Sequence, residues 1–496
     1  MDSVQREEVV VPPVTPMSER SLGRRFLKNS AVLAVGWNIN AVGRLVAAGL
    51  VVRTLGVNVF GEYALLVVWL TIAEWILDFG STEVFVREAN QEPEQRSRMV
   101  RVFLALKGIQ APVAVLVLVT GLIAMQYSHE IVRAGFLASL SLFFTAGVVF
   151  CRANFKAALT MEREVLSEFV SVLVMLPLIV AVAHFGWGVM GLMATYVVSR
   201  AVFCTGCVWQ SRDQVNFSIR GVNLRDIGWG IHSIFAIGII GFVVVLYSAV
   251  DLLVLSRTTS IAGVAVYSAA LRFTMPLTMA LNAIAVSVYP VLSLLKSPEQ
   301  FHKTCQRAVD ITVLLGCLAL VCLWCGAEFF MSLLGRGVVY GADALRILAV
   351  VCVIKAVPMV IGPALFLVRA QRYALAYMLM ALSVKIAVIA GMALKFGYMG
   401  AAFGSLFVET FFLTPVTMFF VQRFTGYTMK FPTILRLIPI VVVIILITRK
   451  LLPQGNILGA VVAGLLYPLL VVGLRVVNPT EILTFLRAHR SEESSA

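Results

Sequence analysis

The chain has 496 residues, of which 60% are hydrophobic and only 13% are charged, and its mean hydropathy is +0.93. Soluble domains carry about 25% charged residues, so this composition excludes a soluble globular protein and predicts an all-α polytopic membrane protein. The net charge of +14 could suggest a nucleic-acid partner. However, the basic residues lie at the ends of apolar stretches, which is typical of membrane orientation, so we expect no nucleic acid.

The first half of the chain predicts one group of membrane helices. Residues 1–29 mix acidic and basic side chains without an apolar core, so we interpret them as a retained N-terminal segment and not as a secretory signal. Because a helix needs about 20 apolar residues to cross the hydrocarbon core, six spans follow within 30–210, which we define as the N-lobe. Their predicted bounds are 30–54, 63–80, 102–126, 132–151, 165–184 and 187–209.

The second half repeats this organisation after a polar linker at 211–228. Six further spans form a C-lobe at 229–422, with bounds at 229–250, 263–292, 311–334, 345–368, 373–395 and 399–421. Two more, at 433–448 and 457–476, precede a charged tail at 477–496. The sequence therefore predicts about 14 transmembrane helices, as two six-helix lobes plus two C-terminal helices.

Two patterns support this organisation. Lys and Arg are concentrated in alternate connecting segments, which predicts that both termini are cytoplasmic. Arg53-Thr54 ends the first predicted span, and Arg257-Thr258 ends the seventh. Tyr63 follows Arg53 by ten residues, and Tyr267 follows Arg257 by the same ten residues. Such a repeat is expected of two lobes in parallel orientation.

Signatures of enzymes and metal sites are missing. The sequence contains no G-x-x-x-x-G-K-[ST] phosphate loop and no D-x-D pair, so we expect neither ATP hydrolysis nor glycosyl transfer. The eight cysteines and five histidines show no spacing typical of a metal site. The pairs Cys204 with Cys207 and Cys322 with Cys325 are interpreted as helix packing. We therefore predict a protein that is not an enzyme and has no metal or cofactor.

Several cations lie near the centres of predicted spans, where a charge is costly. One Arg or Lys there costs about 2.5–3.5 kcal/mol on insertion scales, so such residues are expected to line a wet interior. Asn40 and Arg44 share one face of the first span with Gly36. These positions predict a cationic, substrate-binding cavity suited to a phosphate or diphosphate, and the alternative is an Arg buried between helices. The predicted cavity residues are Arg44, Arg272, Lys355, Lys385 and Asn40.

Acidic groups could supply coupling or gating. Glu409, near the centre of the twelfth span, is the candidate for proton or cation coupling, and a structural pair with Lys355 or Lys385 is the alternative. Glu74 and Asp78 lie on one face of the second span, with Lys107 at a similar depth in the third. These three predict an inner ion-pair gate, and the alternative is that all three are wetted at the interface.

A short motif carries a resemblance to a known family. Leu55 to Tyr63 reads L-G-x-x-x-F-G-x-Y and is followed by Asp78-Phe79-Gly80 and Arg87. This pattern resembles polysaccharide flippases of the Wzx type, in the multidrug/oligosaccharidyl-lipid/polysaccharide exporter superfamily. The second-half counterpart, Ser260 to Tyr267, lacks the L-G and F-G elements.

The resemblance implies a function. Its members are bacterial inner-membrane proteins that move an oligosaccharide repeat unit on undecaprenyl diphosphate from the inner to the outer leaflet, for O-antigen, capsule or exopolysaccharide. It also implies a polysaccharide polymerase and a chain-length regulator as partners. Two alternatives stay open: a cation-coupled drug or small-molecule antiporter of the same superfamily, and a membrane-embedded polymerase or glycosyltransferase.

Overall fold

The computed structural model describes residues 36, 39–91, 96–215, 222–295, 297–368, 370–452 and 456–474. Within these ranges the regular structure is entirely helical. The predicted terminal segments at 1–29 and 477–496 lie outside the described residues. Ten candidate membrane spans occur in the described ranges, which confirms the all-α polytopic fold.

The first half forms a compact group of helices with short connections. Gly186 ends α7 in the left-handed conformation that glycine adopts without strain, and the Ser128 hydroxyl caps α5 by accepting from the Ile131 N–H. After a helix at 39–55, the elements are α2 (Val57–Asp78), α3 (Ser81–Gln91), α4 (Arg96–Ala124), α5 (His129–Ser139), α6 (Ser141–Ala158), α7 (Glu162–Phe185) and α8 (Gly188–Ser211).

The second half begins with two long helices. Asn223 and Asp226 form a capping box at the start of α9. The elements are α9 (Leu224–Thr258), α10 (Ile261–Leu294), α11 (Pro298–Cys325), α12 (Ala327–Leu334), the 3-10 helix η2 (Arg336–Gly341), α13 (Ala342–Ile361), α14 (Ala364–Leu367), α15 (Gln371–Val408), the π-helical turn η3 (Glu409–Leu413), α16 (Thr414–Thr425), α17 (Pro432–Leu451) and α18 (Ile457–Gly473).

Several predicted bounds differ from the observed helices. The predicted span 132–151 is divided between α5 and α6, and the span 311–334 is divided between α11 and α12 at Gly326. Many helices also extend beyond the apolar run, because polar residues continue a helix into the interface. In α15 the backbone departs from helical geometry at Gly397 (φ 59°, ψ −141°). This glycine separates the two spans that were predicted at 373–395 and 399–421.

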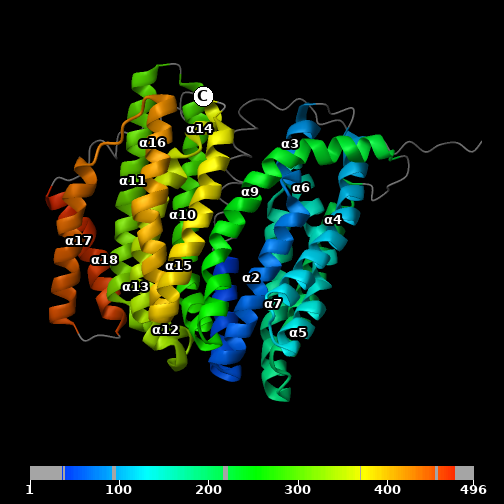
Figure 1. Ribbon diagram of the computed structural model, residues 1–496, viewed down its shortest axis with the longest axis horizontal. Coiled ribbons are helices and arrows are strands. Elements are labelled where there is room, and N and C mark those ends of the chain that lie inside the picture. The colour runs from blue at the N-terminus through cyan, green and yellow to red at the C-terminus, as the bar shows by residue number, and fades with distance from the viewer. Residues whose placement is uncertain are drawn as a thin grey trace, which may run out of the picture.

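Figure 1 shows the helices in two groups, with α4 to α8 on one side and α10 to α16 on the other. Helices α2 and α9 lie between them, and the first turns of α9 cross the end of the bundle. The Trp75 indole donates to the Gly238 carbonyl at 3.2 Å and so joins α2 to α9. Helices α17 and α18 form one edge, beside α11. The predicted lobe boundaries stay a prediction.

The two groups meet at both ends of the bundle. At the end that carries Arg53, its guanidinium donates to the Leu333 carbonyl at 2.9 Å, and the Tyr127 and Ser256 hydroxyls lie 2.6 Å apart. At the opposite end, which we call the basic end because it carries Arg98 and Arg163, Arg98 pairs with Asp226 of α9. We predict that the basic end is cytoplasmic.

The basic end also contains an ion pair between the start of α7 and the residues that follow α8. Arg163 of α7 donates to both carboxylate oxygens of Asp213, at 2.6 and 2.9 Å. These hydrogen bonds lower the pKa of the Asp213 carboxyl because they favour its charged form. The pair ties the start of α7 to the residues that follow α8.

A close approach of α2 to α10 gives the first prediction. A Cβ on Gly61 would lie 2.3 Å from the Ile261 carbonyl oxygen, whereas a Cβ on Gly108 would meet no heavy atom within 4 Å. Gly61→Ala should therefore destabilise the protein by about 1–3 kcal/mol through overpacking. Gly108→Ala, the matched control, should be neutral or stabilise the helix by up to about 1 kcal/mol. Thermal unfolding of both variants in detergent tests this, and equal midpoints would contradict it.

Candidate substrate-binding site

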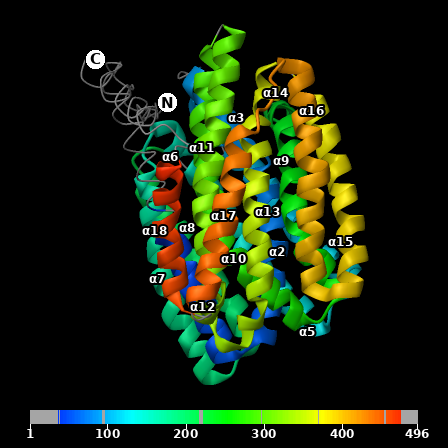
Figure 2. The ribbon, with the colours of Figure 1, turned by 90° about the vertical axis from the view of Figure 1, so that its left-hand side faces the viewer.

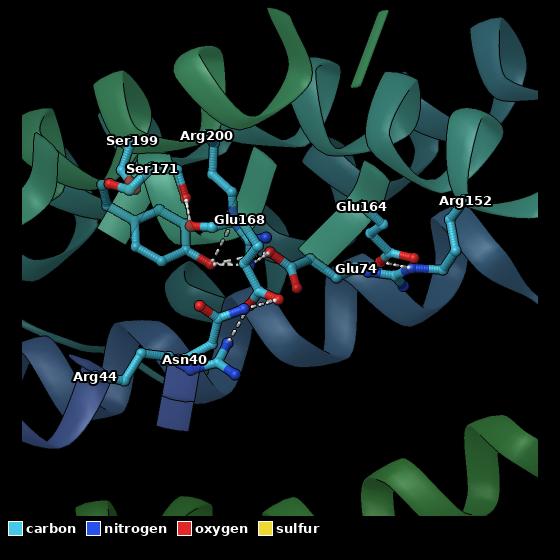
Figure 3. Close-up of polar contacts among 10 residues, drawn as sticks. Asn40, Arg44, Glu74, Arg152, Glu164, Glu168, Ser171, Ser199 and Arg200 are labelled. Carbon is cyan, nitrogen blue, oxygen red and sulfur yellow. Dashed lines mark hydrogen bonds and ion pairs between the residues drawn. The ribbon is translucent and has the colours of Figure 1, made fainter. Parts of the chain in front are cut away.

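The first cluster joins the helix at 39–55 to α7. Asn40 and Arg44 lie one helical turn apart, and both reach Glu168: the Asn40 amide donates to Glu168 Oε2 at 2.8 Å, and Arg44 pairs with Oε1 at 3.1 Å. Figure 3 shows the two side chains converging on this carboxylate. Asn40 is fully buried, whereas the side chain of Arg44 is 45% exposed. Arg44 is therefore paired but still accessible.

A second cluster in the same half surrounds Glu74 of α2. Arg200 of α8 donates to Glu74 Oε1 at 2.7 Å, and the Tyr196 hydroxyl donates to the same oxygen at 2.9 Å. The Arg200 guanidinium also lies 5.1 Å from the centre of the Tyr196 ring. In Figure 3, Arg200 and Glu74 lie beside the Asn40, Arg44 and Glu168 cluster. Two arginines and two glutamates thus neutralise each other in this region.

Sequence reasoning missed Glu168 and Arg200. Arg200 lies within the predicted span 187–209, so its charge is the same kind of signal that identified Arg44. Glu168 lies close to the start of the predicted span 165–184, where a carboxylate is usually wetted, and only the fold shows that it reaches Arg44. The cationic cavity expected from the sequence is therefore balanced by carboxylates in this half.

Arg272 of α10 has a different environment. Its guanidinium carbon lies 5.3 Å from the centre of the Phe60 ring and 6.0 Å from that of Tyr63. Both rings belong to the L-G-x-x-x-F-G-x-Y motif on α2. The Nε–H of Arg272 is buried and has no acceptor among the described residues, and no carboxylate in those ranges forms an ion pair with Arg272. The aromatic faces stabilise the cation, but they do not neutralise its charge.

Arg44 and Arg272 come from opposite halves of the chain, and Arg272 has no acidic partner among the described residues. Guanidinium groups bind phosphate oxygens with two parallel hydrogen bonds. The arrangement can therefore accept an anionic group with several oxygens.

A third cluster is buried in the second half. Lys385 of α15 pairs with Asp251 of α9 at 2.7 Å, and the two side chains are only 4% and 8% exposed. The Lys385 ammonium also donates to the Tyr247 carbonyl at 2.9 Å. The hydroxyls of Tyr267 and Ser405 donate to Asp251 Oδ2 at 2.8 and 2.9 Å. Asp251, which sequence reasoning did not name, is thus the partner of Lys385.

Glu409 is the first residue of the π-helical turn η3. Its Oε1 accepts a hydrogen bond from the Tyr247 hydroxyl at 2.9 Å, while its buried Oε2 has no partner among the described residues. The alternative, a structural ion pair of Glu409 with Lys355 or Lys385, does not form among the described residues: Lys385 pairs with Asp251, and Lys355 lies 5.9 Å from the Tyr247 ring centre. The reason is that Tyr247 lies next to both lysines and takes the hydrogen bond to Glu409. π-Helical turns are frequent at functional sites.

The expected inner gate of Glu74, Asp78 and Lys107 is not assembled as an ion pair. Asp78 caps α3, since its Oδ1 accepts from the Thr82 N–H at 3.1 Å and the Thr82 hydroxyl at 2.7 Å. Lys107 is buried and donates to the Leu77 carbonyl and the Ser81 hydroxyl. Neither carboxylate lies within ion-pair distance of Lys107 in the described ranges, because the turn between α2 and α3 offers nearer oxygen acceptors.

The described residues contain no group of three His, Cys, Asp or Glu side chains that could hold a metal ion. The eight cysteines are free thiols. The polar clusters are thus built from ion pairs, hydroxyls and amides.

Comparison with known proteins assigns the family. The family model described as polysaccharide biosynthesis protein matches residues 26–296, which is more than half of the chain. The chain belongs to this family. The match includes both arginines of the opposed pair and the L-G-x-x-x-F-G-x-Y motif. No curated protein sequence matches the chain.

Solved transporter structures share the fold. The inward closed conformation of the lipid II flippase MurJ matches with a TM-score of 0.75 over 89% of this chain and 98% of that protein, at 11% identity. The inward-facing conformation of a multidrug resistance MATE transporter of the MOP superfamily matches with a TM-score of 0.64 over 78% of this chain and 94% of the transporter, at 14% identity. The outward-facing conformation of a MATE transporter matches with a TM-score of 0.61 over 81% of this chain and 95% of the transporter, at 15% identity. The expected fold of this exporter superfamily is confirmed.

The buried Lys385–Asp251 pair gives the second prediction. Lys385→Met should destabilise the protein by about 3–5 kcal/mol because it leaves the Asp251 carboxylate buried without its counter-charge. Adding Asp251→Asn should recover a large part of this loss, since the unpaired charge is then removed as well. Denaturant unfolding in micelles measures both variants.

A matched control is the exposed pair Lys303–Glu299, whose side chains are 68% and 76% exposed. Lys303→Met should cost less than about 1 kcal/mol. If Lys385→Met cost no more than Lys303→Met, the buried pair would not have the structural role assigned to it.

Proposed function

We propose that the protein translocates an undecaprenyl-diphosphate-linked oligosaccharide repeat unit from the inner to the outer leaflet for cell-surface polysaccharide biosynthesis. The observation that carries the proposal is the environment of Arg272, whose guanidinium contacts aromatic rings but has no acidic partner among the described residues, together with Arg44 from the other half, which is 45% exposed in its pair with Glu168. A diphosphate has the charge and the oxygen geometry to neutralise both. Family membership supports a polysaccharide substrate, and the fold of lipid and drug transporters supports movement across the membrane.

Binding would proceed by exchange of partners at Arg44. Glu168 pairs with Arg44 and itself accepts a hydrogen bond from the Asn40 amide. The side chain of Arg44 is 45% exposed and that of Glu168 is 15% exposed, so water compensates part of the cost of opening the ion pair on the Arg44 side. The diphosphate would replace Glu168 as the partner of Arg44 and would add Arg272 as a second ligand. Sugars would occupy the wet interior while the polyprenyl chain stays in lipid.

The remaining cations divide into two roles. Lys355 is partly exposed and has no ion pair in the described ranges, so it is a further ligand for the cargo. Lys385 is held by Asp251 and is only 4% exposed, so we assign it to the framework of the second half. Glu409, next to Lys355 and Tyr247, is the candidate for proton or cation coupling. Rocking of the two halves would give alternating access.

The proposal includes a place in the cell. The protein would lie in the bacterial inner membrane with both termini in the cytoplasm, because the basic residues gather at one end of the bundle. A polysaccharide polymerase and a chain-length regulator would act on the product after it reaches the outer leaflet. These partners rest on the resemblance to Wzx-type flippases.

One observation favours a second candidate from the same superfamily. Glu74 and Glu168 bring two carboxylates to the interior of the first half, where an organic cation could bind as in a cation-coupled antiporter. Each carboxylate is already neutralised by an arginine, however, whereas Arg272 lacks an acidic partner among the described residues. This positive charge of Arg272, which no carboxylate in the described ranges neutralises, favours an anionic cargo. A membrane-embedded polymerase or glycosyltransferase has no comparable support in the described side chains.

The third prediction tests the opposed arginines. Arg44→Ala and Arg272→Ala should each reduce flipping of a diphosphate-linked oligosaccharide lipid in proteoliposomes by at least about tenfold, since each removes a charge-assisted hydrogen bond. The double variant should reach the background rate. Arg133→Ala, which removes an exposed cation from α5, is the control and should retain wild-type flipping.

Wild-type flipping by the double variant would contradict the proposal. Extrusion of a cationic dye by the wild type, without flipping of the lipid, would instead favour the antiporter.

The fourth prediction concerns the exchange at Arg44. Glu168→Gln should retain flipping and lower the cargo concentration needed for half-maximal rate by a few-fold, because Arg44 no longer has to leave a carboxylate. Glu162→Gln, on the exposed face of the same helix, should change neither quantity. A loss of flipping as severe as that of Arg44→Ala would show that the Glu168 charge is itself needed for transport.

A further inference from the structure

A cavity of about 170 Å³ lies away from the proposed transport path, between the ends of α11, α13, α17 and α18. Figure 2 shows α17 and α18 next to each other at the edge of the bundle, with α11 adjacent. The cavity opens at the end opposite the basic end. Its polar lining comes from Cys325, Asp343, Arg346, Thr448 and Arg449, with Trp324 among the apolar residues. Its volume far exceeds the roughly 10–15 Å³ that one water needs.

The inner wall of this cavity is rigid. Arg346 donates to the Trp324 carbonyl at 3.3 Å and pairs with Asp343 at 2.5 Å and Glu328 at 3.1 Å. The thiol of Cys325 and the hydroxyl of Thr448 lie 3.0 Å apart and join α11 to α17. Both carboxylates near the cavity are therefore already bound to Arg346. They do not neutralise a further cation.

Arg449 supplies that further cation. It lies in the last turn of α17, is exposed, and has no ion pair or hydrogen bond to the described residues. Lys450 follows it directly. Basic residues are otherwise sparse at this end of the bundle, so the gathering of Arg346, Arg449 and Lys450 runs against the general charge distribution. Arg346 is fully engaged by its two carboxylates, so the attraction for an anion comes from Arg449, whose free guanidinium is suited to a phosphate, and from Lys450 beside it.

We propose that this cavity binds the phosphodiester headgroup of an anionic phospholipid. The outer surfaces of the same two helices favour a lipid over a soluble phosphate: Leu446, Leu458 and Val461 are 60%, 48% and 48% exposed. Aliphatic side chains next to the cavity would contact acyl chains while the headgroup enters it. With the basic end cytoplasmic, the lipid would come from the outer leaflet. The proposal does not depend on which cargo the protein transports.

Lipid binding to the purified full-length protein tests the proposal. Detergent-solubilised protein is incubated with phosphatidylglycerol or with zwitterionic phosphatidylcholine, and bound lipid is counted by native mass spectrometry. The wild type should retain phosphatidylglycerol in preference. Arg449→Gln should reduce that retention about fivefold, the contribution of one basic side chain at an anionic lipid surface. Lys395→Gln, an exposed cation of α15 outside the cavity, should leave it unchanged.

A variant of opposite sign and a competitor complete the test. Asp343→Asn removes a negative charge from the cavity and should raise phosphatidylglycerol retention, and unchanged or lower retention would contradict the charge argument. Soluble glycerol phosphate should not displace the lipid at equal concentration. Full displacement would identify a free phosphate site and overturn the lipid assignment. Equal retention by Arg449→Gln and wild type would overturn the site itself. Thermal unfolding of each variant separates loss of binding from loss of folding.

Discussion

The need to neutralise charge inside a low-dielectric bundle governs this structure more than any other interaction. An isolated ion is so costly there that it must find a partner, a dipole or water. Lys385 pairs with Asp251, and Glu74 pairs with Arg200. Lys107 donates to the Leu77 carbonyl of α2 and to the Ser81 hydroxyl of α3. Each of these contacts joins helices that are distant in sequence. Charge pairing therefore fixes which helices are neighbours, in addition to the packing of apolar side chains.

Backbone polar groups impose a similar constraint at the helix ends. An unpaired carbonyl or N–H is expensive in lipid, and the chain satisfies such groups with nearby side chains. Asp78 caps α3, Asn223 and Asp226 cap α9, and Arg53 binds carbonyls at the end of α12. The Arg53 contact also joins the halves of the chain, and Asp226 joins them through its pair with Arg98. The same residues that complete helix ends thus hold the two groups together where connections are short.

The sequence predicted the features that depend on local composition. Helices, their approximate number and mid-span cations such as Arg44 follow from hydropathy alone. What it could not predict depends on three-dimensional neighbours. In the sequence, Glu168 looks like an ordinary interface glutamate, yet in the structure it reaches Arg44 from another helix. Similarly, the partner of Lys385 is Asp251 and not Glu409. The break at Gly397 and the π-helical turn at Glu409 are also invisible to hydropathy, because they change backbone geometry without changing apolar content.

The ion pairs of the two halves differ in how easily they can exchange partners. We infer from this difference that they have different roles. Arg44 is half-exposed in its pair with Glu168, so water compensates much of the loss when the pair opens. Lys385 and Asp251 are almost fully enclosed, and separating them would leave two charges without solvent. A transporter has to exchange ligands at one place while its framework stays intact. We therefore propose that the exchangeable pair, with Arg272, which has no acidic partner among the described residues, is the place for cargo, and that the enclosed pair keeps α9 and α15 together while the halves move.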